Sequence, residues 1–178
     1  IAVSVDGLER YKRWVEQHVT FQGVTHLQQA LERGAGVMVS NGSSALLLDV
    51  TIELGEADDS DFAFGIAVDG SDITVEESVV DGAIGSGLLC VGDAEVNLVD
   101  TTIQNTVPTI EGVSQAIMAV DSCILDISGS SILDTTGLGL FVADAEATLT
   151  DSRIEGTALG GRYYLSPGVV VSDGEVSA

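Results

Sequence analysis

The chain has 178 residues, of which 45% are hydrophobic, so it can bury a core of its own, and an intrinsically disordered chain is excluded. It carries 28 acidic residues against 6 basic ones, a formal net charge of −22, and would be repelled by a nucleic-acid backbone or an anionic membrane surface. No apolar run reaches the length of about 18 residues that spans a bilayer, so we expect no nucleic-acid partner and no membrane insertion.

Residues 1–35 differ from the rest of the chain, and we expect them to form a capping segment with two short helices. The apolar residues of the first helix share one face: Leu8, Tyr11, Trp14 and Val15. A second helix would begin with the capping-box form Thr-His-Leu-Gln at Thr25 and end at Gly34. Because the open end of a solenoid must be covered, these helices would form its N-terminal cap.

One pattern of alternating apolar residues, a turn, a hydroxyl residue and a further apolar residue is written four times between residues 65 and 154. The apolar sets expected to face a common core are Ile66, Val68, Ile73, Val75, Val80; Leu89, Val91, Val96, Leu98, Ile103; Met118, Val120, Leu125, Ile127, Ile132; and Leu140, Val142, Ala147, Leu149, Ile154. Strict alternation predicts short strands. A unit this small cannot bury its own apolar side, so the copies are expected to stack as a solenoid.

The pattern extends to about six coils over residues 36–178. The valines expected to form one interior column are Val39, Val68, Val91, Val120, Val142 and Val171. Their spacing alternates between long and short, and the extra residues follow the third strand of alternate coils, at 56–64, 105–115 and 157–167. The sixth coil stops in mid-turn, so we expect the coils to continue in a longer parent chain.

These repeats resemble the parallel β-helix repeats of the pectin-lyase-like superfamily. The resemblance rests on the Gly-Ile-Ala-Val of residues 65–68, the Asp-Thr-Thr-Ile of 100–103 and the Asp-Ser-Arg-Ile of 151–154. It implies an all-β fold, a right-handed parallel β-helix solenoid with a short α-helical N-terminal cap. Similar proteins include polysaccharide lyases, glycoside hydrolases, pectin esterases, tailspikes and adhesins, so the fold does not choose an activity.

Enzymes that resemble this fold usually place their chemistry on or beside the sheet of first strands. The outward row of that sheet is expected to be Met38, Ala67, Cys90, Ala119, Phe141 and Val170. It holds no acid, base or guanidinium, and an apolar outer face calls for a cover. The cover would be the protein's own long loops or a partner surface, which is another copy of the chain or a further domain of a longer chain.

One carboxylate follows the first strand in each coil after the first, where Asn41 stands instead: Asp69, Asp93, Asp121, Asp144 and Asp173. Ordinary turn chemistry explains such a row, because Asp side chains bond to nearby backbone N–H groups. Unit charges about 5 Å apart also repel by roughly 1 kcal/mol even in water, and Ca²⁺ would relieve that repulsion. The candidate metal ligands are Asp69, Asp93, Asp121 and Asp144. The first three are also the alternative catalytic residues, because hydrolysis of a glycosidic bond needs two carboxylates facing it.

A row of small residues is expected inside the tube, with its hydroxyls bonded to turn backbone: Val50, Ser78, Thr101, Ser130 and Ser152. A serine nucleophile is disfavoured, because it needs a positioned base and both histidines, His18 and His26, lie in the capping segment.

Aromatic residues in two long loops and on the first strand could bind a ligand, because rings with one polar handle suit sugar stacking. These candidates are Phe62, Phe64, Phe141, Tyr163 and Tyr164, with Arg162 beside them. The loop aromatics would equally serve to cover the Phe141 face. Cys90 is expected to point outward and Cys123 to lie in a turn, and their spacing leaves open whether they pair.

The sequence thus favours a non-catalytic β-helix module with a structural or adhesive role. Many acids with a single lysine suit an extracellular or cell-surface protein. The partners expected are a polysaccharide, another protein surface, or a second copy bound through the apolar face or the open C-terminal coil. The alternative is a carbohydrate-active protein of the polysaccharide lyase, glycoside hydrolase or glycan-binding type.

Overall fold

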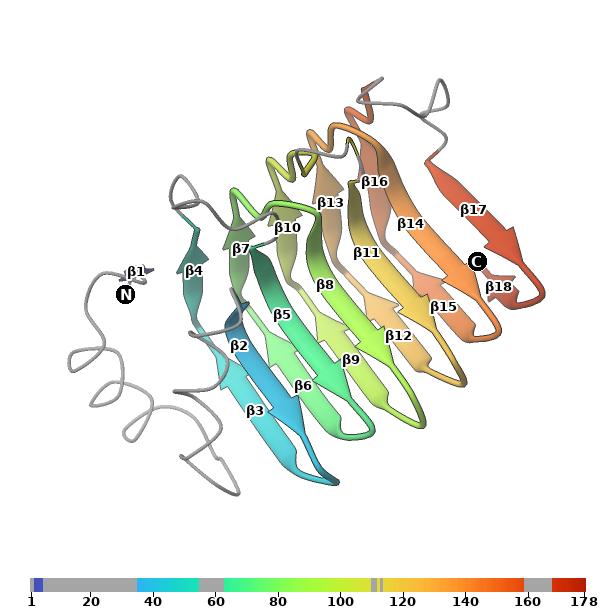
Figure 1. Ribbon diagram of the computed structural model, residues 1–178. Helices are drawn as coiled ribbons and strands as arrows, with labels where there is room; N and C mark the ends of the chain where they lie inside the picture. The colour runs from blue at the N-terminus through green and yellow to red at the C-terminus, as the bar shows by residue number, and fades with distance from the viewer. Residues whose placement is uncertain (1, 5–34, 55–62, 110–111, 113, 159–167) are drawn as a thin grey trace.

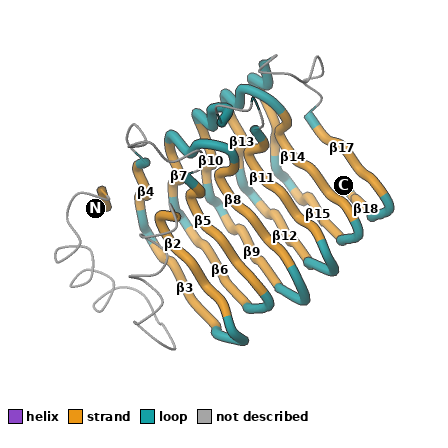
Figure 2. The backbone as a smooth tube through the Cα atoms, in the orientation of Figure 1, coloured by secondary structure: helices purple, strands orange, loops and turns teal. Residues whose placement is uncertain are grey.

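The computed structural model describes residues 2–4, 35–54, 63–109, 112, 114–158 and 168–178. In this part of the chain the regular structure consists of strands β1 to β18, with no helix (Figure 2). The two helices predicted between residues 8 and 34 lie outside the described residues. Strand β1 (Ala2–Ser4) precedes them in the chain.

Each coil contributes up to three strands. The first strands are β2 (Ala35–Ser40), β5 (Phe64–Asp69), β8 (Ser86–Val91), β11 (Gln115–Val120), β14 (Leu138–Ala143) and β17 (Val169–Ser172). The second strands are β3 (Ser44–Leu48), β6 (Asp72–Glu76), β9 (Glu95–Val99), β12 (Ile124–Ser128), β15 (Glu146–Thr150) and β18 (Glu175–Ser177). The third strands are β4 (Thr51–Glu53), β7 (Val79–Asp81), β10 (Thr102–Gln104), β13 (Ser131–Leu133) and β16 (Arg153–Glu155).

Strands of the same rank pair in parallel with those of the neighbouring coils (Figure 1). They form three six-stranded sheets, here called the first, second and third sheet, and β1 completes the third by pairing with β4. Three parallel sheets wound from stacked coils make a parallel β-helix solenoid. The predicted all-β fold of about six stacked coils is therefore confirmed.

The connections between coils alternate in length, as the sequence predicted. Long connections occupy residues 54–63, 105–114 and 156–168, and short ones occupy 82–85 and 134–137. All of them join a third strand to the first strand of the next coil. The long connections therefore begin and end along one edge of the tube, where the third sheet meets the first.

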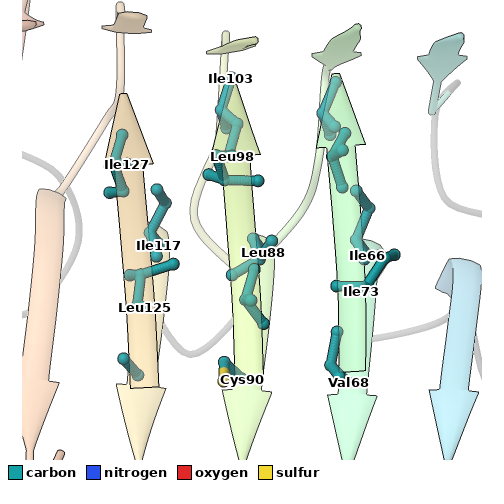
Figure 3. Close-up of a cluster of buried hydrophobic side chains, with 14 of the residues drawn as sticks. Ile66, Val68, Ile73, Leu88, Cys90, Leu98, Ile103, Ile117, Leu125 and Ile127 are labelled. Atoms are coloured by element: carbon teal, nitrogen blue, oxygen red, sulfur yellow. The ribbon is translucent and has the colours of Figure 1, made fainter. Parts of the chain in front are cut away.

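The core fills the tube with branched aliphatic side chains stacked in columns (Figure 3). Ile66, Leu88, Ile117 and Leu140 form one column of the first sheet, and each is fully buried. Burying a side chain of this size contributes about 1.5–3 kcal/mol. Since each coil alone would leave its apolar side in water, stacking is what supplies the stability.

The predicted register of the first strand is wrong by one residue in the third and fourth coils, whereas the register of their second and third strands is right. Cys90 and Ala119 face the core, whereas Val91 and Val120 face outward and are half-buried. The interior column is therefore Val39, Val68, Cys90, Ala119, Val142 and Val171.

The cause is a variable turn between the first and second strands. In the first and fourth coils this turn contains two successive left-handed residues, Asn41 (φ 63°) with Gly42 and Asp121 (φ 53°) with Ser122. In the second and third coils one residue of this turn is left-handed, Gly70 (φ 52°) and Gly92 (φ 73°). The first, third and fourth coils use one residue more than the second and fifth to bring the chain from the interior column into the second sheet.

The predicted row of hydroxyls inside the tube is confirmed as a hydrogen-bonded ladder. The backbone N–H of Thr101 donates to Ser130 Oγ (3.0 Å), and that hydroxyl donates to the carbonyl of Ser128 (2.9 Å). The same pattern links the N–H groups of Val50, Ser78 and Ser130 to the hydroxyls of Ser78, Thr101 and Ser152, at 3.1, 3.4 and 3.1 Å. The hydroxyls thus satisfy buried turn backbone, which the strands themselves leave unpaired.

Replacing Ser130 by alanine is expected to lower the free energy of unfolding by about 1–3 kcal/mol, because the buried N–H of Thr101 loses its acceptor. Urea denaturation followed by circular dichroism measures this change. Ser131→Ala is the control: its Oγ accepts an exposed hydrogen bond from Arg153, and its loss should change stability by less than about 0.5 kcal/mol. Equal effects of the two substitutions would contradict the ladder.

Cys90 and Cys123 form a disulfide inside the tube, which settles the pairing that the sequence left open. The prediction that Cys90 points outward was wrong, and both cysteines are fully buried. Cys90 belongs to the third coil and Cys123 to the turn after β11 in the fourth. The bridge therefore fastens two neighbouring coils to each other from within.

Candidate functional site

The outer face of the first sheet is almost entirely apolar. Its middle column consists of Met38, Ala67, Leu89, Met118, Phe141 and Val170. Leu89 and Met118 replace Cys90 and Ala119 of the predicted row, because the register shift turns those two residues inward. Side chains of this column are half-buried with the exception of Ala67, which is buried.

A second outward column lies beside the first, towards the turn into the second sheet. It contains Ser40, Asp69, Val91, Val120, Ala143 and Ser172. Asp69 is the only charged residue of the two columns in the described strands. We call the apolar members the apolar strip: Met38, Ala67, Leu89, Val91, Met118, Val120, Phe141, Ala143 and Val170.

Two of the predicted ligand-binding aromatics lie on this face. Phe141 belongs to the apolar strip, and Phe64 begins β5, where it packs against the cluster of Ala35, Ala67 and Met38. Phe64 thus covers the N-terminal end of the face. The other members of the predicted group, Phe62, Arg162, Tyr163 and Tyr164, lie outside the described residues.

The predicted row of aspartates is split by the variable turn. The left-handed column that follows the first strand consists of Asn41, Gly70, Gly92, Asp121, Asp144 and Asp173. Asp69 precedes this column by one residue and Asp93 follows it by one, so only Asp121, Asp144 and Asp173 are stacked. Asn, Asp and Gly tolerate the left-handed conformation best, which explains why these residue types recur there.

A second acidic column, which the sequence reasoning missed, begins the second strands. Asp72 pairs in register with Glu95, and Glu146 with Glu175, with the exposed Ile124 between the two pairs. A depression of about 600 Å³ lies at the C-terminal end, lined by Asp144, Glu146, Asp173 and Glu175 among others. Together these residues form an acidic edge along the apolar strip: Asp69, Asp72, Asp93, Glu95, Asp121, Asp144, Glu146, Asp173 and Glu175.

Beside the carboxylates of the first sheet, the described residues hold no cation. Arg153 is the only basic side chain among them, and it lies on the third sheet, where its Nε donates to Ser131 Oγ (3.1 Å). Elimination chemistry needs a base and a cation at one place. The alternative catalytic residues Asp69, Asp93 and Asp121 occupy three different positions of the turn rather than one column.

Among the described residues no group of three or more His, Cys, Asp or Glu side chains is placed to hold a metal ion. The assignment of Ca²⁺ ligands to Asp69, Asp93, Asp121 and Asp144 stays a prediction. It can be tested by whether one substitution among the stacked aspartates raises or lowers the free energy of unfolding.

Asp144→Asn is expected to raise the free energy of unfolding at low salt by up to about 1 kcal/mol, because the stacked carboxylates of Asp121, Asp144 and Asp173 repel one another. Asn41 already occupies the same column, so the backbone accepts the amide. The gain should shrink at high salt, where charges are screened within a few ångströms. Thermal melts at two salt concentrations measure it, and destabilisation that appears only with added Ca²⁺ would show that a bound cation holds the row.

The fold and this face define the chain as a parallel β-helix solenoid with an apolar outer sheet bordered by acids. Comparisons with protein-family models, with curated proteins and with solved structures gave no match. In the described part of the chain no helix is long and apolar enough to cross a membrane.

Proposed function

We propose that the chain is a non-catalytic β-helix module with a structural or adhesive role, of the right-handed, pectin-lyase-like kind. The observation that carries the proposal is the outer face of the first sheet. Six coils present an apolar strip there, with Asp69 as its only charged neighbour in the two outward columns of the described strands. A surface of this kind suits contact with a partner, and in the described strands it carries no cation for elimination chemistry on a sugar chain.

An extracellular or cell-surface location is part of the proposal. The buried bridge between Cys90 and Cys123 supports it, because structural disulfides form and persist in oxidising compartments. The excess of acidic over basic residues keeps such a surface-exposed module soluble.

Glycan binding is the second candidate, favoured by the presence of Phe64 and Phe141 on one outer face. Aromatic rings can stack on sugars. The strip supplies few hydrogen-bond groups beside these rings, whereas sugar hydroxyls lose their water on binding and need polar partners. This candidate therefore ranks below contact with another protein.

Incubation of the whole chain with a panel of acidic and neutral polysaccharides tests the proposal. We expect no new reducing ends and no unsaturated products. Release of either product, lost in the Asp69→Asn or Asp121→Asn variant, would overturn the non-catalytic assignment. Co-sedimentation with insoluble polysaccharides that is lost in Phe141→Ser would establish the glycan-binding alternative instead.

A further inference from the structure

We propose that the apolar strip docks a basic, amphipathic polypeptide segment of a partner protein. This inference rests on the proposed adhesive function and names the class of partner. It combines two surfaces that lie side by side on the described coils, the apolar strip and the acidic edge.

The dimensions of the strip suit a single polypeptide segment. Coils of a parallel sheet are about 4.8 Å apart, so the six first strands span about 24 Å along the tube. The two outward columns are about 7 Å apart, as expected for alternate residues of a strand. A helix of about 16 residues covers the same length, and its apolar stripe would fit between the two columns.

The side chains at the centre of the strip are suited to anchoring. Phe141 and Met118 are stacked in adjacent coils, with Leu89 next in the same column. Aromatic side chains and Met are enriched at the centres of protein interfaces, and Met adapts to the shape of its partner.

The charge expected of the partner follows from the acidic edge, which runs beside the apolar strip. Asp121, Asp144 and Asp173 are stacked in the turn where the first strands end, and Glu146 and Glu175 are stacked immediately beyond. A segment lying on the strip would place its own flank against these carboxylates. Lys or Arg at that flank would be attracted, whereas Asp or Glu would be repelled.

Charge also disfavours the other occupants of the strip. A second copy of the chain carries the same net charge of −22, and a symmetric pairing would bring two copies of one acidic surface together. An anionic membrane surface would be repelled for the same reason. Both are therefore outcomes of the test and not part of the proposal.

The probe is a synthetic 16-residue amphipathic peptide of Leu and Lys, its length matched to about 24 Å of helix, titrated into the whole chain by isothermal calorimetry. The comparison peptides are a Leu/Glu peptide with the same pattern and a Leu/Lys peptide of the same composition without an apolar stripe. We expect the patterned Leu/Lys peptide to bind at least about tenfold more tightly than the other two. Equal binding of the scrambled peptide would overturn the proposal, because attraction between net charges alone would then explain the affinity.

Variants locate the binding site. Met118→Ser with Phe141→Ser should weaken binding at least about tenfold, while Leu46→Ser with Leu48→Ser, on the exposed outer face of the second sheet, should leave it unchanged. Neutralising Asp121, Asp144 and Asp173 with Asn should weaken binding several-fold and reduce its salt dependence. Cooperative thermal unfolding and an unaltered circular dichroism spectrum verify that the variants fold, and the Asn variants are expected to melt no lower than the unmodified chain.

Three results would overturn the inference: equal losses in both double Ser variants, no loss in either, or a dimer of the unmodified chain that Met118→Ser with Phe141→Ser abolishes in sedimentation. The polysaccharide assay reports on the proposed function independently of these titrations. A chain that cleaves no polysaccharide and shows no preference among the peptides would remain a non-catalytic module, with the partner class alone refuted.

Discussion

Gly65→Val is expected to lower the free energy of unfolding by about 3 kcal/mol or more, the largest effect that we predict for a single substitution in this chain. A Cβ atom at Gly65 would overlap the backbone carbonyl of Gly87 and the side chain of Val80. The obstructing atoms include backbone of the next coil, so the strain cannot be relieved by rotating a side chain. It would instead push two coils apart.

The reason lies in a column of small residues where the first sheet passes close to the third. The column consists of Gly36, Gly65, Gly87, Ala116, Gly139 and Gly168. At Gly36, Gly87 and Gly139 an added Cβ would likewise meet an isoleucine of the third strand and a carbonyl of the next coil. The residues of this column must therefore be small, because the first and third sheets approach each other closely there.

Gly70→Asn is the matched control. Gly70 has φ 52° and no atom within 4 Å of an added Cβ, and Asn41 occupies the equivalent turn position with φ 63°. We expect a change of less than about 1 kcal/mol, because Asn tolerates the left-handed conformation. Urea denaturation of both variants gives the comparison. A Gly65→Val variant as stable as Gly70→Asn would refute the close packing of the first and third sheets.

Removing the disulfide by Cys90→Val with Cys123→Ala is expected to lower the free energy of unfolding by about 2–4 kcal/mol. The bridge joins residues 33 apart in the sequence, and in the chain-entropy model a loop of that length restricts the unfolded chain by about 4 kcal/mol. The replacements are chosen from the columns themselves. Val68 neighbours Cys90 in the interior column of the first sheet, and the turn column of Cys123 contains Ala94 and Ala145.

Because Val and Ala preserve the packing at these two positions, the loss in the free energy of unfolding measures the contribution of the disulfide. A reducing agent should destabilise the unmodified chain towards the stability of the double variant and leave the variant itself unchanged. Denaturation midpoints of both proteins, with and without the reducing agent, provide the values needed. A double variant as stable as the oxidised chain would show that the bridge contributes nothing to holding the third and fourth coils together.

The fold could be predicted from the sequence because the same hydrophobic pattern is repeated along the chain. Period-two alternation recurs in every coil, and a single misread residue leaves the number of coils and strands unchanged. The hydroxyl ladder was predicted for the same reason. Its hydroxyl residues each follow the end of a second strand by the same number of residues: Ser78, Thr101, Ser130 and Ser152.

The faces of the first sheet were harder to predict because their register depends on a turn of variable length. Val91 and Val120 match the valines of the other coils in type, so alignment of the repeats favours them over Cys90 and Ala119. The extra residue in these turns has no hydrophobic signature and is recognisable only from the strand pairing on either side of the turn. A wrong face for Cys90 in turn hid the disulfide. The acidic column of the second sheet does not depend on that register, because the inward residues predicted for the second strands are correct; the exposed Ile124 interrupts its charge pattern.

The apolar strip and its position beside the acidic edge depend on the corrected register of the first strands. Cysteine labelling tests this register directly. In the native protein, Met118→Cys should react with a maleimide reagent without denaturation, because Met118 is half-buried on the outer face. Ile117→Cys should stay unreactive until the protein is denatured, because Ile117 is fully buried in the core. A protected thiol in the Met118→Cys variant, together with rapid labelling of the Ile117→Cys variant, would restore the register expected from the valines and remove the basis of the proposed surface.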